Sequence, residues 1–278
     1  MTLETPPAPL RSFTLTIGTG SQTRHIAVIQ RPARKANAEN APLVVWFHGF
    51  RSSMHSVKAE ALDGWAERNG LGLLRFDYSG HGDSSGRFED ATISRWLEEA
   101  LAVIRSAGEK HVLLIGSSLG GWMVLLAAQA LRADPAVRVT GLVTLAPAVN
   151  FTERLLWQAL PPTYQEKLLR EKVLEIPEPE SDTRFTIGLT LIEDGRTHLL
   201  YREPLILGAP IHIIQGKEDT SVPWQTAQEL FEHCAQDPAE LTFVADGSHR
   251  LERPQDLALI ERALEGMLGA SNTGTRKP

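Results

Sequence analysis

The chain has 278 residues, of which 42% are hydrophobic and 22% are charged, and its formal net charge is -6 at pH 7. This composition is ordinary for a globular protein, and it argues against a nucleic-acid-binding protein, which would need a basic face. The single cysteine, Cys234, excludes an internal disulfide and fits a reducing compartment. No apolar run approaches the roughly 20 residues of a membrane-spanning helix, and the N-terminal residues lack a signal-peptide pattern. We therefore expect a cytoplasmic protein without stable membrane insertion.

Apolar runs along the chain alternate with helical patterns. Two short alternating runs, FTLTIG and TRHIAVIQ, predict an N-terminal hairpin of exposed strands. The later runs LVVWF, LGLLRF, HVLLI, VTGLVTLA, IHIIQ and LTFVA predict buried parallel strands. Between them, segments such as ATISRWLEEALAVIRSA place apolar residues on one helical face. This alternation predicts a single α/β domain over residues 1–278, with a mostly parallel central sheet and helices on both faces.

Residues 151–204 interrupt this rhythm. The first part, FTERLLWQALPPTYQEKLLREKVLEIPEPE, is expected to form helices split at Pro161 and Pro162, and the rest is ambiguous between helix and strand. An insertion of this length between core strands is typical of a lid, so we expect a helical cap over residues 151–204. Its first helix has an apolar side that either lines an acyl pocket or packs the insertion onto the core. This side consists of Phe151, Leu155, Leu156 and Ala159.

The stretch HVLLIGSSLGGWMVLL holds two adjacent serines between an apolar strand and a helix predicted over 119–131. A nucleophilic serine on such a tight turn needs small residues two positions before and two positions after it. Ser118 has Gly116 and Gly120 at these positions, whereas Ser117 has bulky apolar residues there. The pattern G-x-S-x-G therefore selects Ser118 as the candidate nucleophile. The alternative is a turn of small residues with no catalytic role.

A serine hydroxyl needs a base to become a nucleophile, and the base is most often a histidine. On a strand–turn–helix scaffold of this kind, the catalytic residues follow in the order Ser, acid, His. His249 lies in a loop after the last apolar strand and is the candidate base, whereas His81 precedes Ser118. Glu218 and Asp219 both follow the strand IHIIQ and could orient the histidine. We favour Asp219, which leads into TSVP, and keep Glu218 as the alternative.

Attack on a carbonyl creates an oxyanion, which two backbone N–H groups can stabilise. One is expected from Leu119, the residue after the nucleophile. The other is expected from the loop HGFRSS, where Gly49 allows a close approach of the backbone, so we select the N–H of Phe50. The side chain of His48 is expected to brace this loop. Such chemistry uses side chains and backbone groups alone, so we expect no cofactor and no metal.

The segments HGF, RFDYSGHGDSSG, GSSLGG, GKEDTSVP and SHR together resemble the α/β-hydrolase fold family, and they span nearly the whole chain. In that family the pattern G-x-x-D-x-x-V-P carries the acid, which implies Asp219 here. FDYSGHGDSSG, GSSLGGW and DTSVPW are also similar to the branch that includes mitochondrial depalmitoylases and acyl-glucuronide esterases with their bacterial relatives. This resemblance implies hydrolysis of fatty-acyl esters or thioesters by Ser118, Asp219 and His249.

The sequence therefore predicts a serine hydrolase that acts on carboxylic esters or acyl-thioesters of a small molecule or an acylated partner. A serine peptidase or amidase would use the same three side chains and stays an alternative. A non-catalytic ligand-binding protein of the same fold is a second alternative, and it predicts a damaged triad. Enzymes that cleave halides or epoxides need a carboxylate at position 118, which is a serine here. The sequence leaves the oligomeric state open.

Overall fold

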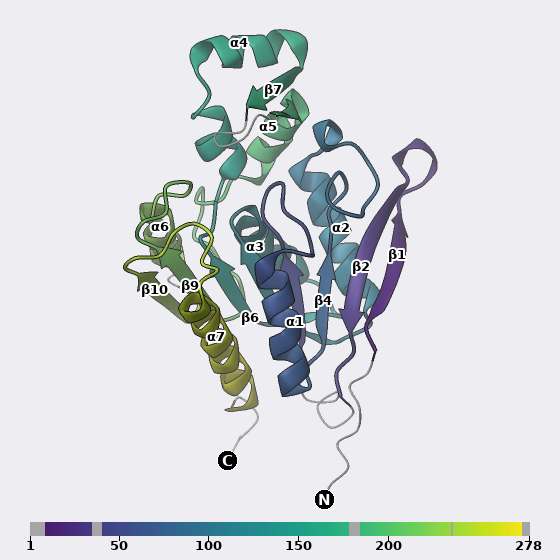
Figure 1. The fold of residues 1–278 in the computed structure, drawn as a ribbon, viewed down its shortest axis with the longest axis vertical. Helices are drawn as coiled ribbons and strands as arrows, with labels where there is room; N and C mark the ends of the chain where they lie inside the picture. Colours follow the sequence, from purple (N-terminus) through teal and green to yellow (C-terminus); the bar gives the residue numbers. More distant parts are fainter. Residues whose placement is uncertain (1–8, 35–40, 178–183, 235, 274–278) are drawn as a thin grey trace, which may run out of the picture.

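The computed structural model describes residues 9–34, 41–177, 184–234 and 236–273, and its centre is an eight-stranded sheet (Figure 1). The strands are β1 (Arg11–Ile17), β2 (Arg24–Arg31), β3 (Leu43–Phe47), β4 (Leu73–Phe76), β5 (His111–Ser117), β6 (Arg138–Leu145), β9 (Ile211–Gly216) and β10 (Ala239–Val244). Their order across the sheet is β1-β2-β4-β3-β5-β6-β9-β10. β2 is antiparallel to both of its neighbours, and the other adjacent strands are parallel. The predicted mostly parallel α/β sheet is therefore confirmed.

Helices cover both faces of this sheet. They are α1 (Val57–Asn69), α2 (Ile93–Ser106), α3 (Leu119–Leu131), α4 (Pro162–Glu171), α5 (Leu189–Gly195), α6 (Gln225–His233) and α7 (Pro254–Thr273), with short turns at Gly20–Gln22, Phe88–Asp90, Thr152–Trp157 and Arg196–His198. α1 and α7 pack on one face around Trp46 and Trp65, and α2, α3 and α6 pack on the other around Trp96 and Trp122. In the described ranges, no helix is long and apolar enough to cross a membrane.

The N-terminal hairpin forms as predicted, but only its first strand is exposed. β1 is exposed along most of its length, whereas β2 is mostly buried. The reason is that β2 pairs with β1 on one side and with β4 on the other. The hairpin thereby extends the central sheet by two antiparallel strands.

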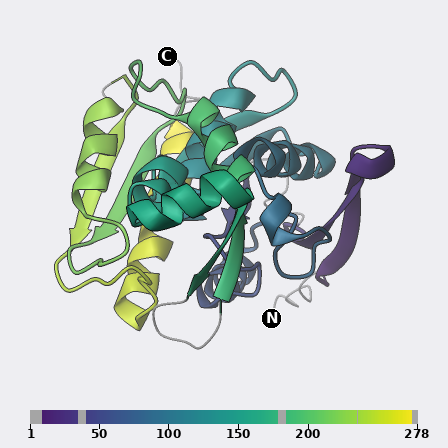
Figure 2. The same cartoon turned by 90° about the horizontal axis from the view of Figure 1, so that it is seen from above.

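The insertion between β6 and β9 is not purely helical, which corrects the expected helical cap. After a π-helical turn at Thr152–Trp157 and the helix α4, the chain forms β7 (Val173–Pro177), which pairs antiparallel with β8 (Arg184–Gly188). Lys172 has a left-handed φ of +66° and ends α4. The next residues alternate between exposed and buried positions, with Leu174 buried, and such alternation is the pattern of a strand. Figure 1 shows α4, β7 and α5 at the upper end of the molecule, and Figure 2, seen from above, shows this green segment in front of the rest of the chain.

Candidate active site

Ser118 lies on the sharp connection between β5 and α3. Its backbone has φ 56° and ψ -120°, a conformation that residues other than glycine rarely adopt. The backbone N–H of Ser118 donates to the carbonyl of Leu145 (2.9 Å), which anchors the turn to β6. Ser118 is partly exposed, whereas Ser117 is a buried residue of β5. Ser118 is thus the more exposed of the two adjacent serines, although Ser117 lines the same pocket.

The glycines at positions 116 and 120 permit this turn because neighbouring backbone atoms leave no room for a Cβ there. A Cβ at Gly116 would lie 2.2 Å from the carbonyl oxygen of Gly120, and a Cβ at Gly120 would lie 2.1 Å from that of Phe47. Real Cβ atoms do not approach backbone oxygens so closely, because the repulsion is too strong. The G-x-S-x-G pattern therefore follows from the geometry of the turn itself.

Asp219 and His249 are brought together from two different loops, after β9 and after β10. His249 Nδ1 lies 2.8 Å from Asp219 Oδ2. The same oxygen accepts a hydrogen bond from Gln215 Nε2 (3.0 Å), and Oδ1 accepts from the backbone N–H groups of Ser221 and Val222 (2.8 Å each). Burial alone would raise the pKa of Asp219, but the hydrogen bonds from His249, Val222 and Ser221 outweigh it and hold the pKa below its ordinary value.

Glu218, the alternative acid, is placed differently. Its side chain is exposed, and its backbone N–H donates to the carbonyl of Gly247 (2.9 Å). The contact to His249 comes from the buried Asp219. The geometry therefore favours Asp219 as the carboxylate that orients the histidine.

Ser118 and His249 line one pocket of about 260 Å³, which opens at the carboxyl ends of β3 and β5. Phe50 and Ser52 of the loop after β3 line the same pocket, and so do Ser56 and Lys58 at the start of α1. In the described part of the chain, no hydrogen bond joins the Ser118 hydroxyl to His249, and this bond is often long in free enzymes. The carboxyl ends of parallel strands are the usual place of active sites in such sheets.

The two expected oxyanion donors belong to Leu119, which directly follows Ser118, and to Phe50, which lines this pocket. Leu119 is the first residue of α3, where a helix leaves its backbone N–H groups without intrahelical acceptors. Phe50 follows Gly49, which lies close to Ser118. A Cβ added at Gly49 would lie 3.4 Å from Ser118 Cβ. Across the residues that the structure describes, neither the N–H of Phe50 nor that of Leu119 has a hydrogen-bond acceptor. Both N–H groups can thus donate to a substrate oxygen, which is what an oxyanion donor requires.

Aromatic side chains gather around Phe50. Its ring centroid lies 5.1 Å from that of Phe88, 4.7 Å from that of Phe151 and 5.9 Å from that of Phe185. Phe151 and Phe185 belong to the insertion, and the guanidinium of Arg51 lies 4.4 Å from the centre of the Phe185 ring. The insertion thus contributes aromatic rings to the surroundings of the candidate site. Of the predicted apolar side of its first helix, Leu156 is buried and Ala159 is exposed.

Two other histidines near the site are buried and do not have the properties of a base. His48 Nδ1 lies 2.8 Å from the carbonyl oxygen of Gly49, which agrees with the expected brace of the loop. Burial lowers the pKa of His48 to about 4. His81 accepts from the backbone N–H of Arg51 (3.2 Å) and packs against Trp96, and burial lowers its pKa to about 3. Both rings are therefore neutral parts of the core.

Sequence reasoning missed two residues that hold the site. Gln215 supports Asp219 and also donates to the carbonyls of Gly216 and Val222. Its position in the sequence, as a polar residue at the end of the strand IHIIQG, could have indicated this role. Lys58 contacts the loop that carries His249, although its partner Glu252 is 194 positions away in the chain. Such a distant pairing leaves no local signal in the sequence.

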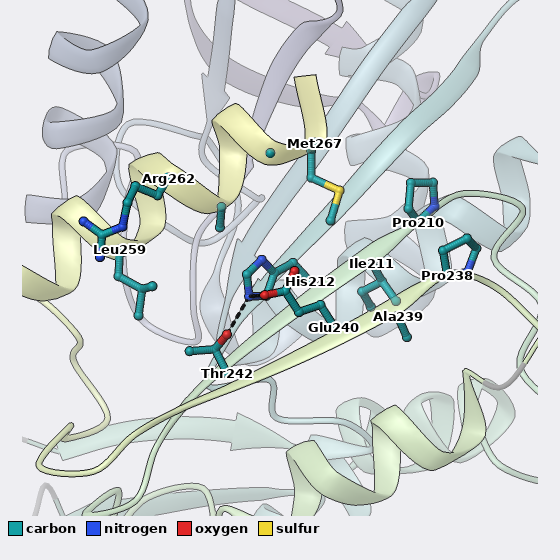
Figure 3. Close-up of a pocket in the computed structure, with 12 residues that line it drawn as sticks. Pro210, Ile211, His212, Pro238, Ala239, Glu240, Thr242, Leu259, Arg262 and Met267 are labelled. Atoms are coloured by element: carbon teal, nitrogen blue, oxygen red, sulfur yellow. Dashed lines mark hydrogen bonds and ion pairs between the residues drawn. The ribbon is translucent and has the colours of Figure 1, made fainter. Parts of the chain in front are cut away.

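A second pocket, of about 500 Å³, lies between β9, β10 and α7 and is shown in Figure 3. Its lining includes His212, whose Nε2 lies 2.8 Å from Thr242 Oγ1. Ile211 and Ala239, the first residues of their strands, also line it, so the pocket lies at the end of the sheet opposite to Ser118. It contains none of the predicted site residues. Among the described residues, no group of three or more His, Cys, Asp or Glu side chains is arranged to hold a metal ion.

The sequence pattern of the Alpha/beta hydrolase family matches residues 44–259, a range that contains Ser118, Asp219 and His249. The chain belongs to this family. A structure from Agrobacterium vitis S4, described as a candidate hydrolase, is 40% identical and superposes with a TM-score of 0.89 over 94% of this chain and 100% of that one. The family assignment and the α/β-hydrolase fold expected from the sequence are thus confirmed.

Mitochondrial proteins are also among the relatives. The chain is 27% identical over 233 residues to the mitochondrial palmitoyl-protein thioesterase ABHD10 of Mus musculus. The aligned residues make up 84% of this chain and 77% of the relative. The structure of mouse alpha/beta hydrolase domain-containing protein 10 superposes with a TM-score of 0.79 at 24% identity, over 94% of this chain and 99% of that one. The predicted relationship to this branch of the family is therefore confirmed.

Proposed function

We propose that this hydrolase cleaves carboxylic esters or acyl-thioesters through a covalent acyl-enzyme, with Ser118 as nucleophile, His249 as base and Asp219 as orienting acid. The observation that carries this proposal is the strained, partly exposed Ser118 on the wall of a pocket that it shares with an Asp219-bound His249. The name of the ABHD10 relatives, palmitoyl-protein thioesterase, supports the ester or thioester class.

In the proposed first step, His249 Nε2 takes the proton of Ser118 as its oxygen attacks the substrate carbonyl. The buried carboxylate of Asp219 keeps the second proton of the ring on Nδ1, so that Nε2 is the acceptor. The imidazolium then donates the proton to the departing alcohol or thiol. Water then enters and gives a proton to His249 as its oxygen attacks the acyl carbonyl. The bond between Ser118 Oγ and the acyl group breaks, His249 returns the proton to Oγ, and the carboxylic acid leaves.

The backbone N–H groups of Phe50 and Leu119 are the proposed oxyanion donors. In serine hydrolases, the loss of one such donor raises the barrier by about 3–4 kcal/mol. Because both groups belong to the main chain, side-chain substitution cannot remove them directly. Their alignment depends on Gly49 and on the helical start at Leu119.

We further propose that residues 151–204 act as a cap and that the acyl group of the substrate is apolar. Phe151 and Phe185 of this segment pack against Phe50, and Phe50 lines the Ser118 pocket. The pocket itself has many polar lining residues, among them Ser52, Lys58 and Glu252. The apolar surface that this proposal requires is therefore supplied by Phe50 and by the aromatic rings packed against it. A fatty-acyl or aromatic acyl group fits this environment.

The cytoplasmic location that we expect from the sequence stays a prediction, since the ABHD10 relatives are described as mitochondrial. Fractionation of cells that produce the tagged protein tests it. Recovery in a mitochondrial fraction would contradict the prediction.

Turnover by the purified protein of p-nitrophenyl esters and acyl-thioesters of graded length tests the proposal, with matched amides in the same panel. We expect hydrolysis of esters or thioesters that the Ser118→Ala variant loses while keeping its fold. Preferential cleavage of the amides would instead indicate a peptidase or amidase. Binding without turnover of any member would indicate the non-catalytic alternative.

A further inference from the structure

A buried lysine touches the loop that carries the proposed base. Lys58 lies in the first turn of α1 and is only 7% exposed. Its Nζ donates to the backbone carbonyl of Arg250 (2.6 Å) and to Glu252 Oε1 (2.9 Å). Arg250 is the residue directly after His249. The ammonium group therefore holds the main chain one residue beyond the histidine.

The loop needs such support because its backbone is strained. Leu251, between the two partners of Lys58, has a φ of +47°, and its side chain is 1% exposed in the core. A residue other than glycine keeps such a φ only where the surroundings impose it. On the other side of His249, Gly247 accepts a hydrogen bond from the backbone N–H of Glu218 (2.9 Å). The loop is thus fixed on both sides of the histidine, by the Asp219 loop and by Lys58.

A general contribution to stability does not explain this arrangement. A buried ammonium loses its hydration, and an ion pair that is taken out of water recovers this loss only with good geometry and further hydrogen bonds. Burial indeed lowers the pKa of Lys58, and Glu252 opposes this shift. An apolar residue could pack α1 against the loop without this penalty. The lysine adds two directed hydrogen bonds to the segment that follows His249.

We propose that Lys58 is a positioning residue, which holds the loop of His249 in place and thereby keeps the imidazole aligned between Asp219 and Ser118. This inference rests on the proposed function, because it takes His249 as the base. Lys58 also lines the Ser118 pocket, so direct contact with the substrate is the competing role. The two roles differ in the kinetic constant that they affect.

The test compares kcat and KM for a p-nitrophenyl ester in three variants of the full chain. Lys58→Met removes the ammonium group and keeps an unbranched apolar side chain that matches the lysine up to Cε. Lys58→Met combined with Glu252→Gln also avoids an unpaired buried carboxylate, and it serves if the single variant fails to fold. Arg68→Met is the matched control, because Arg68 lies on the same helix and pairs with Glu261 of α7 (2.8 Å) away from the site.

We expect kcat to fall about 10- to 100-fold in both Lys58 variants, the effect of a displacement near 1 Å, with KM within twofold of the parent value. The low-field proton resonance of the His249–Asp219 hydrogen bond should weaken in the Lys58 variants and persist in Arg68→Met. An unchanged kcat in a folded Lys58 variant, or a rise in KM alone, would overturn the inference. Full activity of His249→Ala would instead overturn the proposed function, so the two failures are distinguishable.

Discussion

Replacement of Asp219 by Asn tests the electrostatics of the site, and the structure specifies the outcome. Asp219 Oδ1 accepts from the backbone N–H groups of Ser221 and Val222, and Oδ2 accepts from His249 Nδ1 and Gln215 Nε2. The amide oxygen of Asn must face the two backbone donors. Its NH₂ group then takes the place of Oδ2 and points a donor at His249.

The consequence is the wrong tautomer of the imidazole. His249 must present an unprotonated Nδ1 to the new donor, so its proton moves to Nε2, the atom that has to accept the proton of Ser118. In a serine protease, the equivalent change lowers kcat by about 10⁴-fold, which corresponds to about 5 kcal/mol of barrier. We therefore expect kcat of Asp219→Asn to fall by about three to four orders of magnitude, with KM nearly unchanged. The free energy of unfolding should fall by only about 1–3 kcal/mol.

Steady-state hydrolysis of a p-nitrophenyl ester and urea unfolding of the same samples measure the two quantities. Glu218→Gln is the matched control, because it removes the adjacent exposed carboxylate. We expect this control to retain parental activity. A kcat of Asp219→Asn within tenfold of the parent, or an equal loss in Glu218→Gln, would refute the reasoning.

Three further predictions use the same structure. Gly120→Ala should lower the free energy of unfolding by about 3 kcal/mol and abolish turnover, because its Cβ would lie 2.1 Å from a backbone oxygen of β3. Gly266→Ala, in open space on α7, is the control: urea unfolding should show a gain of about 0.5–1 kcal/mol in its free energy of unfolding. Burial lowers the pKa of His48 to about 4 and of His81 to about 3, so the unfolded chain binds more protons than the folded chain between about pH 6.5 and 4. The free energy of unfolding should then fall with decreasing pH in this window, by about 1.4 kcal/mol per pH unit for each histidine, and a flat profile in urea unfolding at pH 7 and 4.5 would contradict this. Phe185→Ala should lower kcat/KM about tenfold for a long-chain or aromatic ester relative to the acetate, whereas equal losses on both substrates would count against an acyl site at the aromatic cluster.

The fold was predictable because its elements are decided by local patterns. The six apolar runs all became strands of the central sheet, and the helix after Ser118 has the predicted bounds, Leu119–Leu131. The error lay in Val173–Pro177, which was expected to be helical. This segment is a strand because it pairs with Arg184–Gly188, and pairing between separate segments depends on tertiary contacts that a short window does not contain.

The candidate site was predictable to a similar extent. Gly116, Ser118 and Gly120 could be read directly, because the steric needs of the turn act over five consecutive residues. The choice of Asp219 and His249 depended on chain order, and the structure places them 2.8 Å apart. Lys58 could not be found, because its role arises only when α1 packs beside a loop almost two hundred positions later in the chain.

The most direct test of the central claim is the rate and position at which a fluorophosphonate modifies the protein, followed by peptide mass spectrometry. An activated nucleophile should be phosphonylated at Ser118 in the native protein. The rate should fall by several orders of magnitude in His249→Ala and drop to background in urea-unfolded protein. Modification at Ser117 or elsewhere, or an equal rate at Ser118 without His249, would contradict the account.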